Sequence, residues 1–215
     1  SGHVGGANEL TVSLARLLSA EPIITTQSDN VGLWALDTLP EKYDWALEVL
    51  PKGNTTPVSD EQRNSWLNQA IALFVDRKPT ALLLECPVEG GEYLIETLPS
   101  HVDLYQDVAS IPVDKYSLVI AVTPWIHAYP ALCIQYVPKV LHVGMGCKRD
   151  LLVDIQLLKE KILTSLREQH LSEKAICSLD SVDIKADEKA LLLLAEALHV
   201  PFYTYPATEL KEIEV

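Results

Sequence analysis

The sequence has little of what membrane, secreted and metal-binding proteins depend on. Its 215 residues contain a single methionine, Met145, and begin at Ser1. No apolar run approaches the roughly 18 residues of a membrane-spanning helix, and no basic start followed by an apolar stretch suggests a signal peptide. We therefore expect a cytoplasmic protein that does not enter a membrane. Because no initiator methionine is present, we also expect a chain processed or cut from something longer, with a strand before its opening loop.

Cysteine is scarce, and no Cys-x-x-Cys pair occurs. The sequence therefore lacks the dense disulfide framework that small secreted domains need. His127, His142 and Cys133 do not have the spacing of zinc ligands, so we predict no structural metal. The four cysteines, which we expect to be reduced, are Cys86, Cys133, Cys147 and Cys177.

Basic residues are few as well, since 17 lysines and arginines face 30 aspartates and glutamates, for a net charge of -13. This balance argues against nucleic-acid binding, in which a basic face supplies most of the affinity. Exposed charges lose influence beyond about 10 Å at ordinary salt. An anionic small substrate would therefore need a site with positive charge of its own.

Apolar residues make up 48% of the chain, enough for one large domain or two small ones, and two fit the pattern better. Alternating strands and helices predict a layered α/β fold. Region 31–49 is left unassigned beyond some helix, and Pro138 is the expected domain boundary. Asn8 is the expected cap of a helix at 9–19, and Ser59 with Gln62 has the spacing of a capping box at the start of a second helix. Two further helices are expected at 155–166 and 188–199. The expected strands are 22–26, 80–85, 117–122, 131–137, 140–144, one within 175–184, and 201–205.

The stretch VGMGCKRD places Gly144 and Gly146 in an expected tight turn between a strand and a helix. Such a turn can bind carboxylates or phosphates through free N–H groups at the helix start, and Lys148 and Arg149 add positive charge. The alternative is that the glycines only make a tight connection. A dinucleotide-binding fingerprint would need a third glycine at the position of Arg149. Cys147 could be an activated thiol at a helix start, although a buried structural cysteine is favoured.

A second stretch, LDSVDIKADE, alternates charge with small residues after an expected strand. An ion pair of Lys185 and a carboxylate-rich helix N-terminus are both plausible, and a solvated helix entry is the favoured alternative. The acidic residues around Lys185 are Asp180, Asp183, Asp187 and Glu188.

A third stretch, HVGGAN, places the imidazole of His3 beside two glycines and a helix start. Ester hydrolysis needs a base that activates water and donors that hold the oxyanion, and this arrangement could supply either. A single His-Gly-Gly is a weak signal by residue type alone.

Three parts of the chain, taken together, resemble the cobalt-precorrin-5A hydrolase family, CbiG, of the anaerobic cobalamin pathway. They are GHVGGANEL with PIITTQSD, then VLHVGMGCKRD, then SVDIKADEKALLLLAEAL with VPFYTY. The resemblance spans nearly the whole chain and is weakest from about Trp34 to Ile111. It implies that 1–30 is the remnant of a Rossmann-like N-terminal domain, that 31–137 is a variable central α/β region and that 138–215 is a small three-layer α/β domain similar to CobE. Asp150 stands where the family commonly has glycine, which puts a simple anion cradle in doubt.

The resemblance implies an enzyme that opens the lactone of cobalt-precorrin-5A and releases acetaldehyde, giving cobalt-precorrin-5B. The substrate is a cobalt corrinoid that bears many carboxylates. Cobalt would arrive with this substrate, so no protein-bound cofactor is implied, and other enzymes of the pathway such as methyltransferases are the implied partners. The alternatives are a non-catalytic module that binds or carries corrinoid intermediates and, disfavoured by the missing third glycine, a nucleotide-binding regulator.

The resemblance brings no settled catalytic set, so we assign expected roles. His3 is the expected general base, Asp29 a second candidate base, and Asn8 with the backbone of Gly5 and Gly6 the expected oxyanion donors. The expected substrate-binding residues are Gly144, Gly146, Cys147, Lys148, Arg149, Asp183, Lys185 and Asp187.

Overall fold

A computed structural model describes residues 7–20, 32–148 and 154–211. The chain divides into two units, each described here by itself. The central unit comprises the described residues up to Thr123 together with His127–Tyr136. The C-terminal unit comprises Pro124–Ile126 and the described residues from Val137 onward.

The central unit is built on a five-stranded sheet with the strand order β1-β5-β4-β2-β3. Strand β2 pairs in parallel with β3 and β4, and β4 pairs in parallel with β5. The strands are β1 (Ala46–Leu50), β2 (Thr80–Leu84), β3 (Val102–Tyr105), β4 (Leu118–Val122) and β5 (Leu132–Val137). The helices are α1 (Ala7–Leu18), α3 (Leu39–Tyr43), α4 (Asp60–Val75), α5 (Gly91–Glu96) and the 3₁₀ turn η1 (Val108–Ser110).

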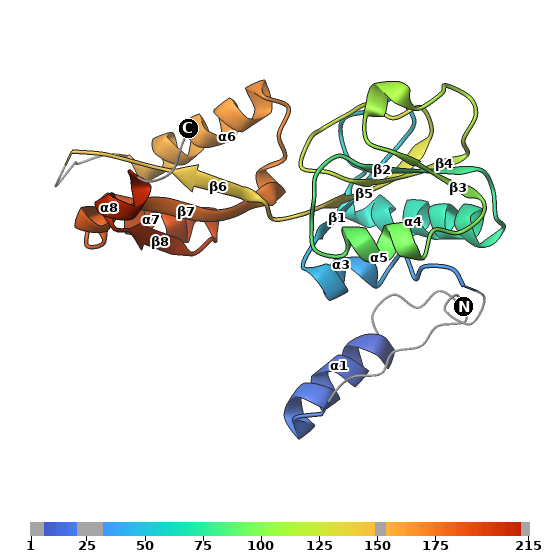
Figure 1. Ribbon diagram of the computed structural model, residues 1–215, viewed down its shortest axis with the longest axis horizontal. Helices are drawn as coiled ribbons and strands as arrows, with labels where there is room; N and C mark the ends of the chain where they lie inside the picture. The colour runs from blue at the N-terminus through green and yellow to red at the C-terminus, as the bar shows by residue number, and fades with distance from the viewer. Residues whose placement is uncertain (1–6, 21–31, 149–153, 212–215) are drawn as a thin grey trace. The chain divides into compact units, whose positions relative to one another are not determined.

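Both faces of this sheet are buried. On one face, Leu82, Ile120 and Ile134 pack with α4, α5 and the segment around Trp34, and Figure 1 shows α4 and α5 on the same side of the strands. On the other face, Leu83 and Ala121 pack against residues of the loops around Ile111 and Tyr129. Burial on both faces explains why β2, β4 and β5 are nearly continuous apolar runs.

The order of the strands creates a topological switch point. From β2 the chain passes through α5 to β3 on one side, and it then returns to β4 on the other side of β2. The carboxyl ends of β2 and β4 therefore lie next to each other, and open α/β sheets bind ligands at such positions.

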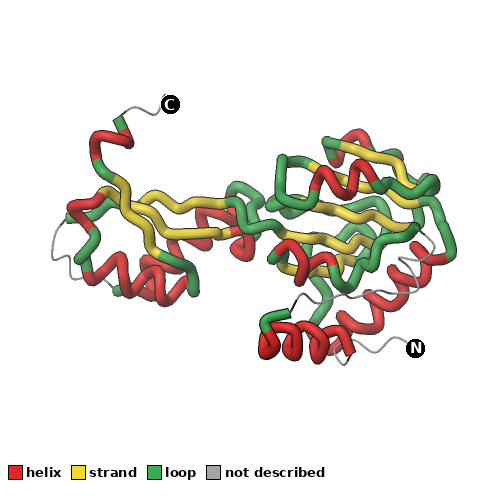
Figure 2. Tube along the Cα trace, turned by 60° about the horizontal axis from the view of Figure 1, so that its bottom comes forward, coloured by secondary structure: helices red, strands yellow, loops and turns green. Residues whose placement is uncertain are grey.

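The C-terminal unit has a three-stranded parallel sheet in the order β6-β7-β8 (Figure 2). Its strands are β6 (Leu141–Gly144), β7 (Ile176–Val182) and β8 (Phe202–Tyr205). Its helices are α6 (Ile155–Glu168), α7 (Lys189–Leu198) and α8 (Ala207–Leu210), with the 3₁₀ turns η2 (Glu173–Ala175) and η3 (Asp183–Lys185).

Helices α6 and α7 pack on one face of this sheet. Val143, Leu179 and Phe202 are paired in register and form one apolar cluster with both helices. Side chains alternate along a strand, so the neighbours of these residues lie on the opposite face. We call this the open face, and it carries His142, Gly144, Ser178, Asp180, Tyr203 and Tyr205.

The structure confirms most predicted elements and corrects several. The expected α/β fold is present, and β2, β4, β5, β6, β7 and β8 fall on predicted strands. Helix α4 begins after Ser59 as predicted, but the Ser59 side chain makes no capping hydrogen bond. Helix α1 begins at Ala7, so Asn8 lies within it instead of capping it. Strand β1 overlaps the end of the unassigned region 31–49, and β3 and α5 were not predicted. The strand predicted at 22–26 lies outside the described residues.

The four cysteines are free thiols. None of the helices within the described ranges is both long and apolar enough to cross a membrane.

Candidate functional site

Most of the predicted catalytic residues fall where the structure gives no description. His3, Gly5, Gly6, Asp29 and Arg149 lie outside the described residues. Asn8 lies in the first turn of α1. The roles expected of these residues therefore stay predictions.

Gly144 and Gly146 do not form the expected tight turn. Gly144 is the last residue of β6, and neither Gly144 nor Gly146 has a positive φ or a neighbour that a Cβ would meet. Among the described residues the next helix is α6, which begins at Ile155, and the Asp154 carboxylate accepts hydrogen bonds from the Gln156 and Leu157 N–H groups at 2.9 and 3.2 Å. Residues 149–153 lie outside the described residues, so the anion site and the place of Cys147 at a helix start stay predictions.

The structure does bring the two predicted binding stretches of the C-terminal unit together. The Met145 N–H donates to the Asp180 carbonyl at 2.8 Å, and the Ser181 hydroxyl donates to the Met145 carbonyl at 2.7 Å. Residues 144–148 thus run beside the end of β7, which leads directly into Asp183–Lys185. Lys148 is exposed in this segment.

The predicted ion pair of Lys185 is present. Its Nζ lies 3.7 Å from a carboxylate oxygen of Glu188, and both side chains are largely buried. The Asp183 carboxylate accepts the Ile184 N–H at 2.8 Å, and the Asp183 and Asp187 side chains are exposed. Lys185 is therefore engaged in a local ion pair. Of the predicted substrate-binding lysines and arginine, Lys148 is the exposed one within the described residues.

A polar cluster that the sequence did not reveal lies at the switch point of the central unit. Glu85 follows β2 directly, and Thr123 follows β4 directly. One Glu85 carboxylate oxygen accepts the Thr123 hydroxyl at 2.5 Å and lies 2.8 Å from Nε2 of His127. The side chains of Glu85 and His127 are only 11% and 22% exposed. We call Glu85, Thr123 and His127 the Glu85 site.

The electrostatics of the Glu85 site favour a charged carboxylate. Burial raises the pKa of Glu85, but hydrogen bonds from His127 and Thr123, the charge of His127 and a hydrogen bond from the Val108 backbone together hold this pKa below its ordinary value. An anionic Glu85 accepts hydrogen bonds only, so Nε2 of His127 must carry the proton that it shares. In the neutral ring Nδ1 then holds a lone pair, which suits it to take a proton from water.

The adjacent thiol is not activated. Burial, with a smaller contribution from the charge of Glu85, raises the pKa of Cys86. A thiol with a raised pKa stays protonated near neutral pH and is a poor nucleophile. The arrangement therefore supports proton transfer by His127 over covalent catalysis by Cys86.

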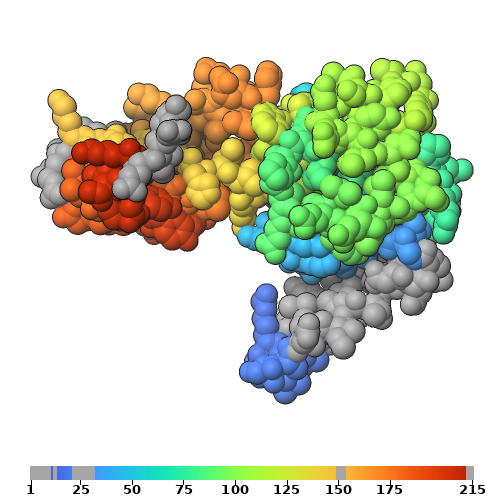
Figure 3. Space-filling view, viewed as in Figure 1, coloured from blue at the N-terminus to red at the C-terminus, as the bar shows by residue number. Residues whose placement is uncertain are grey.

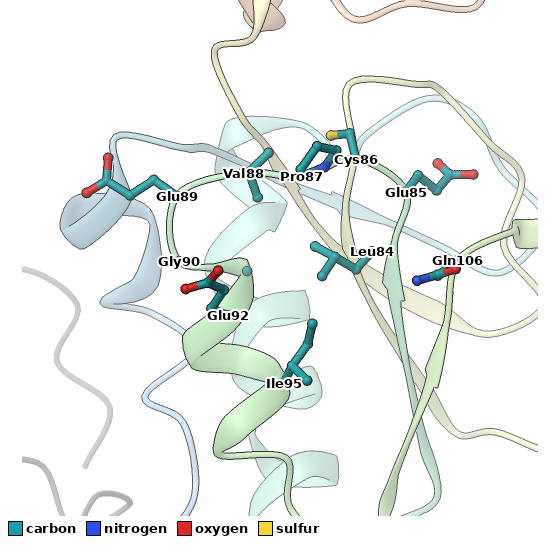
Figure 4. Close-up of a pocket in the computed structure, with 11 residues that line it drawn as sticks. Leu84, Glu85, Cys86, Pro87, Val88, Glu89, Gly90, Glu92, Ile95 and Gln106 are labelled. Carbon is teal, nitrogen blue, oxygen red and sulfur yellow. The ribbon is translucent and has the colours of Figure 1, made fainter.

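A pocket of about 790 Å³ adjoins this site. Figure 4 shows Glu85 and Gln106 on one side of it and Glu89 and Glu92 on the other. The turn between Glu89 and Glu92 depends on Gly90. The φ of Gly90 is +87°, and a Cβ at this position would lie 2.7 Å from the Tyr43 ring.

A second histidine is held on the open face of the C-terminal unit. Nδ1 of His142 lies 2.7 Å from the Ser178 hydroxyl and 3.3 Å from an Asp180 carboxylate oxygen. Ser178 in turn donates to Asp180 at 2.9 Å. We call these three residues the His142 cluster. Within the described residues, no group of three or more histidine, cysteine, aspartate or glutamate side chains is arranged to hold a metal ion.

The comparisons with known proteins agree along the whole chain. Three family models match in order: cobalamin synthesis G N-terminal at residues 1–29, cobalamin biosynthesis central region at 34–138 and cobalamin synthesis G C-terminus at 141–215. Two curated relatives, both named cobalt-precorrin-5A hydrolase, are 31% identical (Salmonella typhimurium) and 28% identical (Priestia megaterium) over all of this chain. The chain spans only 56% and 54% of their lengths.

A crystal structure of a cobalamin biosynthesis protein G homolog from Sulfolobus solfataricus also matches, at 15% identity. The match covers all of this chain and 54% of that one, with a TM-score of 0.32.

Proposed function

Because the chain belongs to the cobalamin biosynthesis protein G family, CbiG, we propose that it is part of an enzyme that hydrolyses the lactone of cobalt-precorrin-5A. One observation carries the proposal: two curated proteins with that name align with every part of this chain. The chain spans about half of their length, so the activity is proposed for the protein that contains it.

The reaction requires water to be activated at the lactone carbonyl. His127 has the geometry of a general base, because Glu85 holds Nε2–H at 2.8 Å and leaves the lone pair on Nδ1. When Nδ1 takes a proton from the attacking water, the anionic Glu85 stabilises the imidazolium that forms. His3, the base expected from the sequence, is the second candidate for this role.

The substrate's carboxylates need positive charge in an otherwise acidic chain. Lys148 and Arg149 are the proposed partners, through the positive charge of their side chains. Cobalt enters with the substrate in this proposal, and no cofactor bound to the protein is required.

The test is acetaldehyde release by the full-length enzyme. We expect His127→Gln to lower kcat by about 10²–10⁴-fold, the usual contribution of a general base. Glu85→Gln should lower kcat less, because the imidazole base would remain but lose the negative charge that stabilises its protonated form. The matched control is His199→Asn, which replaces an exposed histidine with positive φ by a residue that tolerates this conformation.

Each outcome has a distinct meaning. Full turnover in His127→Gln combined with loss in His3→Ala would transfer the role of base to His3. Absence of acetaldehyde with the intact wild-type enzyme would refute the proposed activity. Tight corrinoid binding without turnover would then favour a carrier.

A further inference from the structure

The open face of the C-terminal unit presents one imidazole that is fixed at one nitrogen and free at the other. The side chain of His142 is 58% exposed, whereas Asp180 behind it is 14% exposed and Ser178 is fully buried. Within the described residues Nε2 of His142 has no hydrogen-bond partner. We propose that this Nε2 is an axial ligand to the cobalt ion of the corrinoid substrate.

The hydrogen bonds determine which ring nitrogen is available. The Ser178 hydroxyl donates its only proton to Asp180, at 2.9 and 3.1 Å from the two carboxylate oxygens. Its oxygen can then only accept from Nδ1 of His142, which must carry the ring proton. In the neutral ring Nε2 therefore holds the lone pair, and it points away from the partners that fix the ring.

This arrangement is the one that metal-binding histidines use. A ligating imidazole usually donates its second N–H to a carboxylate, a carbonyl or a bridging group, which sets the tautomer and raises the basicity of the ligating nitrogen. Ser178 and Asp180 supply such a relay. The rest of the coordination sphere would come from the macrocycle, so a single protein ligand is sufficient.

The geometry does not suit a serine nucleophile. A serine–histidine–aspartate triad uses opposite ring nitrogens for the serine and the carboxylate. Here both Ser178 and Asp180 face the same nitrogen, Nδ1, and the Ser178 side chain is enclosed. The cluster therefore orients the ring and does not activate the hydroxyl.

The surroundings of His142 can accept a flat macrocycle. Gly144, the next residue of β6 on this face, has no side chain and open space above its backbone. Across the sheet, two strand spacings of about 4.8 Å away, Tyr203 and Tyr205 are 49% and 39% exposed. Residues of β8 and beyond (red) reach the surface in Figure 3. Lys148 lies beyond the carboxyl end of the same sheet, where peripheral carboxylates could reach it.

The proposed step is a ligand exchange that changes no oxidation state. A cobalt–nitrogen bond to Nε2 forms, a cobalt–oxygen bond to an axial water breaks, and the water leaves with its electron pair. This inference rests on the proposed function, because it takes the cobalt corrinoid as the substrate.

The test uses cobinamide, a cobalt corrinoid whose axial positions are open to water. Titration of the chain with aquacobinamide should shift the visible absorption of the corrinoid, because imidazole replaces water on cobalt. His142→Ala should abolish this shift and His199→Asn should retain it. Ser178→Ala and Asp180→Asn should weaken the binding about 10–100-fold, as loss of such supporting partners usually does.

A second measurement identifies the ligand atom. With cob(II)inamide, the electron paramagnetic resonance signal should show splitting from one ring nitrogen, and its pattern should change when histidine is labelled with nitrogen-15. An unchanged absorption shift in His142→Ala, or no binding by the wild-type chain, would overturn the proposal. Circular dichroism of each variant separates loss of the ligand from loss of the fold.

These readouts need no turnover, so they are independent of the acetaldehyde assay. A histidine ligand without acetaldehyde release would leave the coordination standing and remove the proposed hydrolysis. Acetaldehyde release by the wild type, together with an absorption shift that is unchanged in His142→Ala, would leave the proposed hydrolysis standing and remove the coordination.

Discussion

The two units of this chain both use a parallel sheet, but they cover it differently. In the central unit, apolar clusters bury both faces, and β4 and β5 are buried at every residue. In the C-terminal unit, α6 and α7 cover one face, and burial alternates along β6 and β8. Polar chemistry must therefore lie at different places in the two sheets.

Each unit has a histidine that is hydrogen-bonded to a carboxylate or lies beside one, and the two histidines occupy different places relative to their sheets. The Glu85 site lies just beyond the ends of β2 and β4, because residues within those strands are part of the core. His142 lies inside β6, because one face of its strand is open. A sheet that is covered on both faces confines chemistry to its ends, whereas a sheet that is covered on one face can use its surface.

The largest expected effect tests how fully each face is covered. Ile120→Ala in β4 should lower the free energy of unfolding of the central unit by about 2–5 kcal/mol, the usual cost of a large cavity in a core. Tyr203→Ala on the open face should cost less than about 1 kcal/mol, since exposed positions contribute little. Urea unfolding followed by circular dichroism measures both. A comparable loss from Tyr203→Ala would contradict the comparison.

An intermediate effect on stability is expected from replacing one glycine in each unit, Gly90 and Gly146. Gly90→Ala should destabilise the chain by about 1–3 kcal/mol, because residues other than glycine are strained at a φ of +87° and the new Cβ would meet the Tyr43 ring. Gly146→Ala, which has open space and no positive φ, should be neutral or slightly stabilising. Thermal unfolding of the pair measures the difference, and equal melting temperatures would show that the Gly90 turn does not constrain the pocket.

The smallest effect is a pH dependence of stability from Glu85. Its pKa in the folded chain lies below its ordinary value of 4.5, so its ionised form contributes stability above that pH, and this contribution is lost as pH falls through the folded pKa. Glu85→Gln should therefore be less stable than the wild type near neutral pH, and the difference should shrink in acid. Thr123→Val, which removes one donor, should lose part of the same contribution. Unfolding midpoints from pH 3 to pH 7 measure both, and a difference that grows in acid would reverse the assignment.

In the central unit, the strands that the sequence predicted are those with strong apolar runs. TALLL, LVIAV and LCIQYV have few other stable places than the interior of a sheet. Strands β1 and β3 contain charged residues, Glu48 and Asp103, so they do not stand out as apolar runs. Their position was decided by pairing with neighbouring strands.

The chemistry-bearing residues divide in the same way. Composition, charge and the stretches that carry the family resemblance were enough to predict an α/β protein of this family and the ion pair of Lys185. His127 and Glu85 are separated by 42 positions, and His142 and Ser178 by 36. A hydrogen bond depends on distances of about 3 Å, and local sequence patterns carry no such information across that separation. The sequence by itself therefore determined the family and the buried strands. Only the tertiary structure decided which histidines lie within hydrogen-bonding or ion-pair distance of a carboxylate.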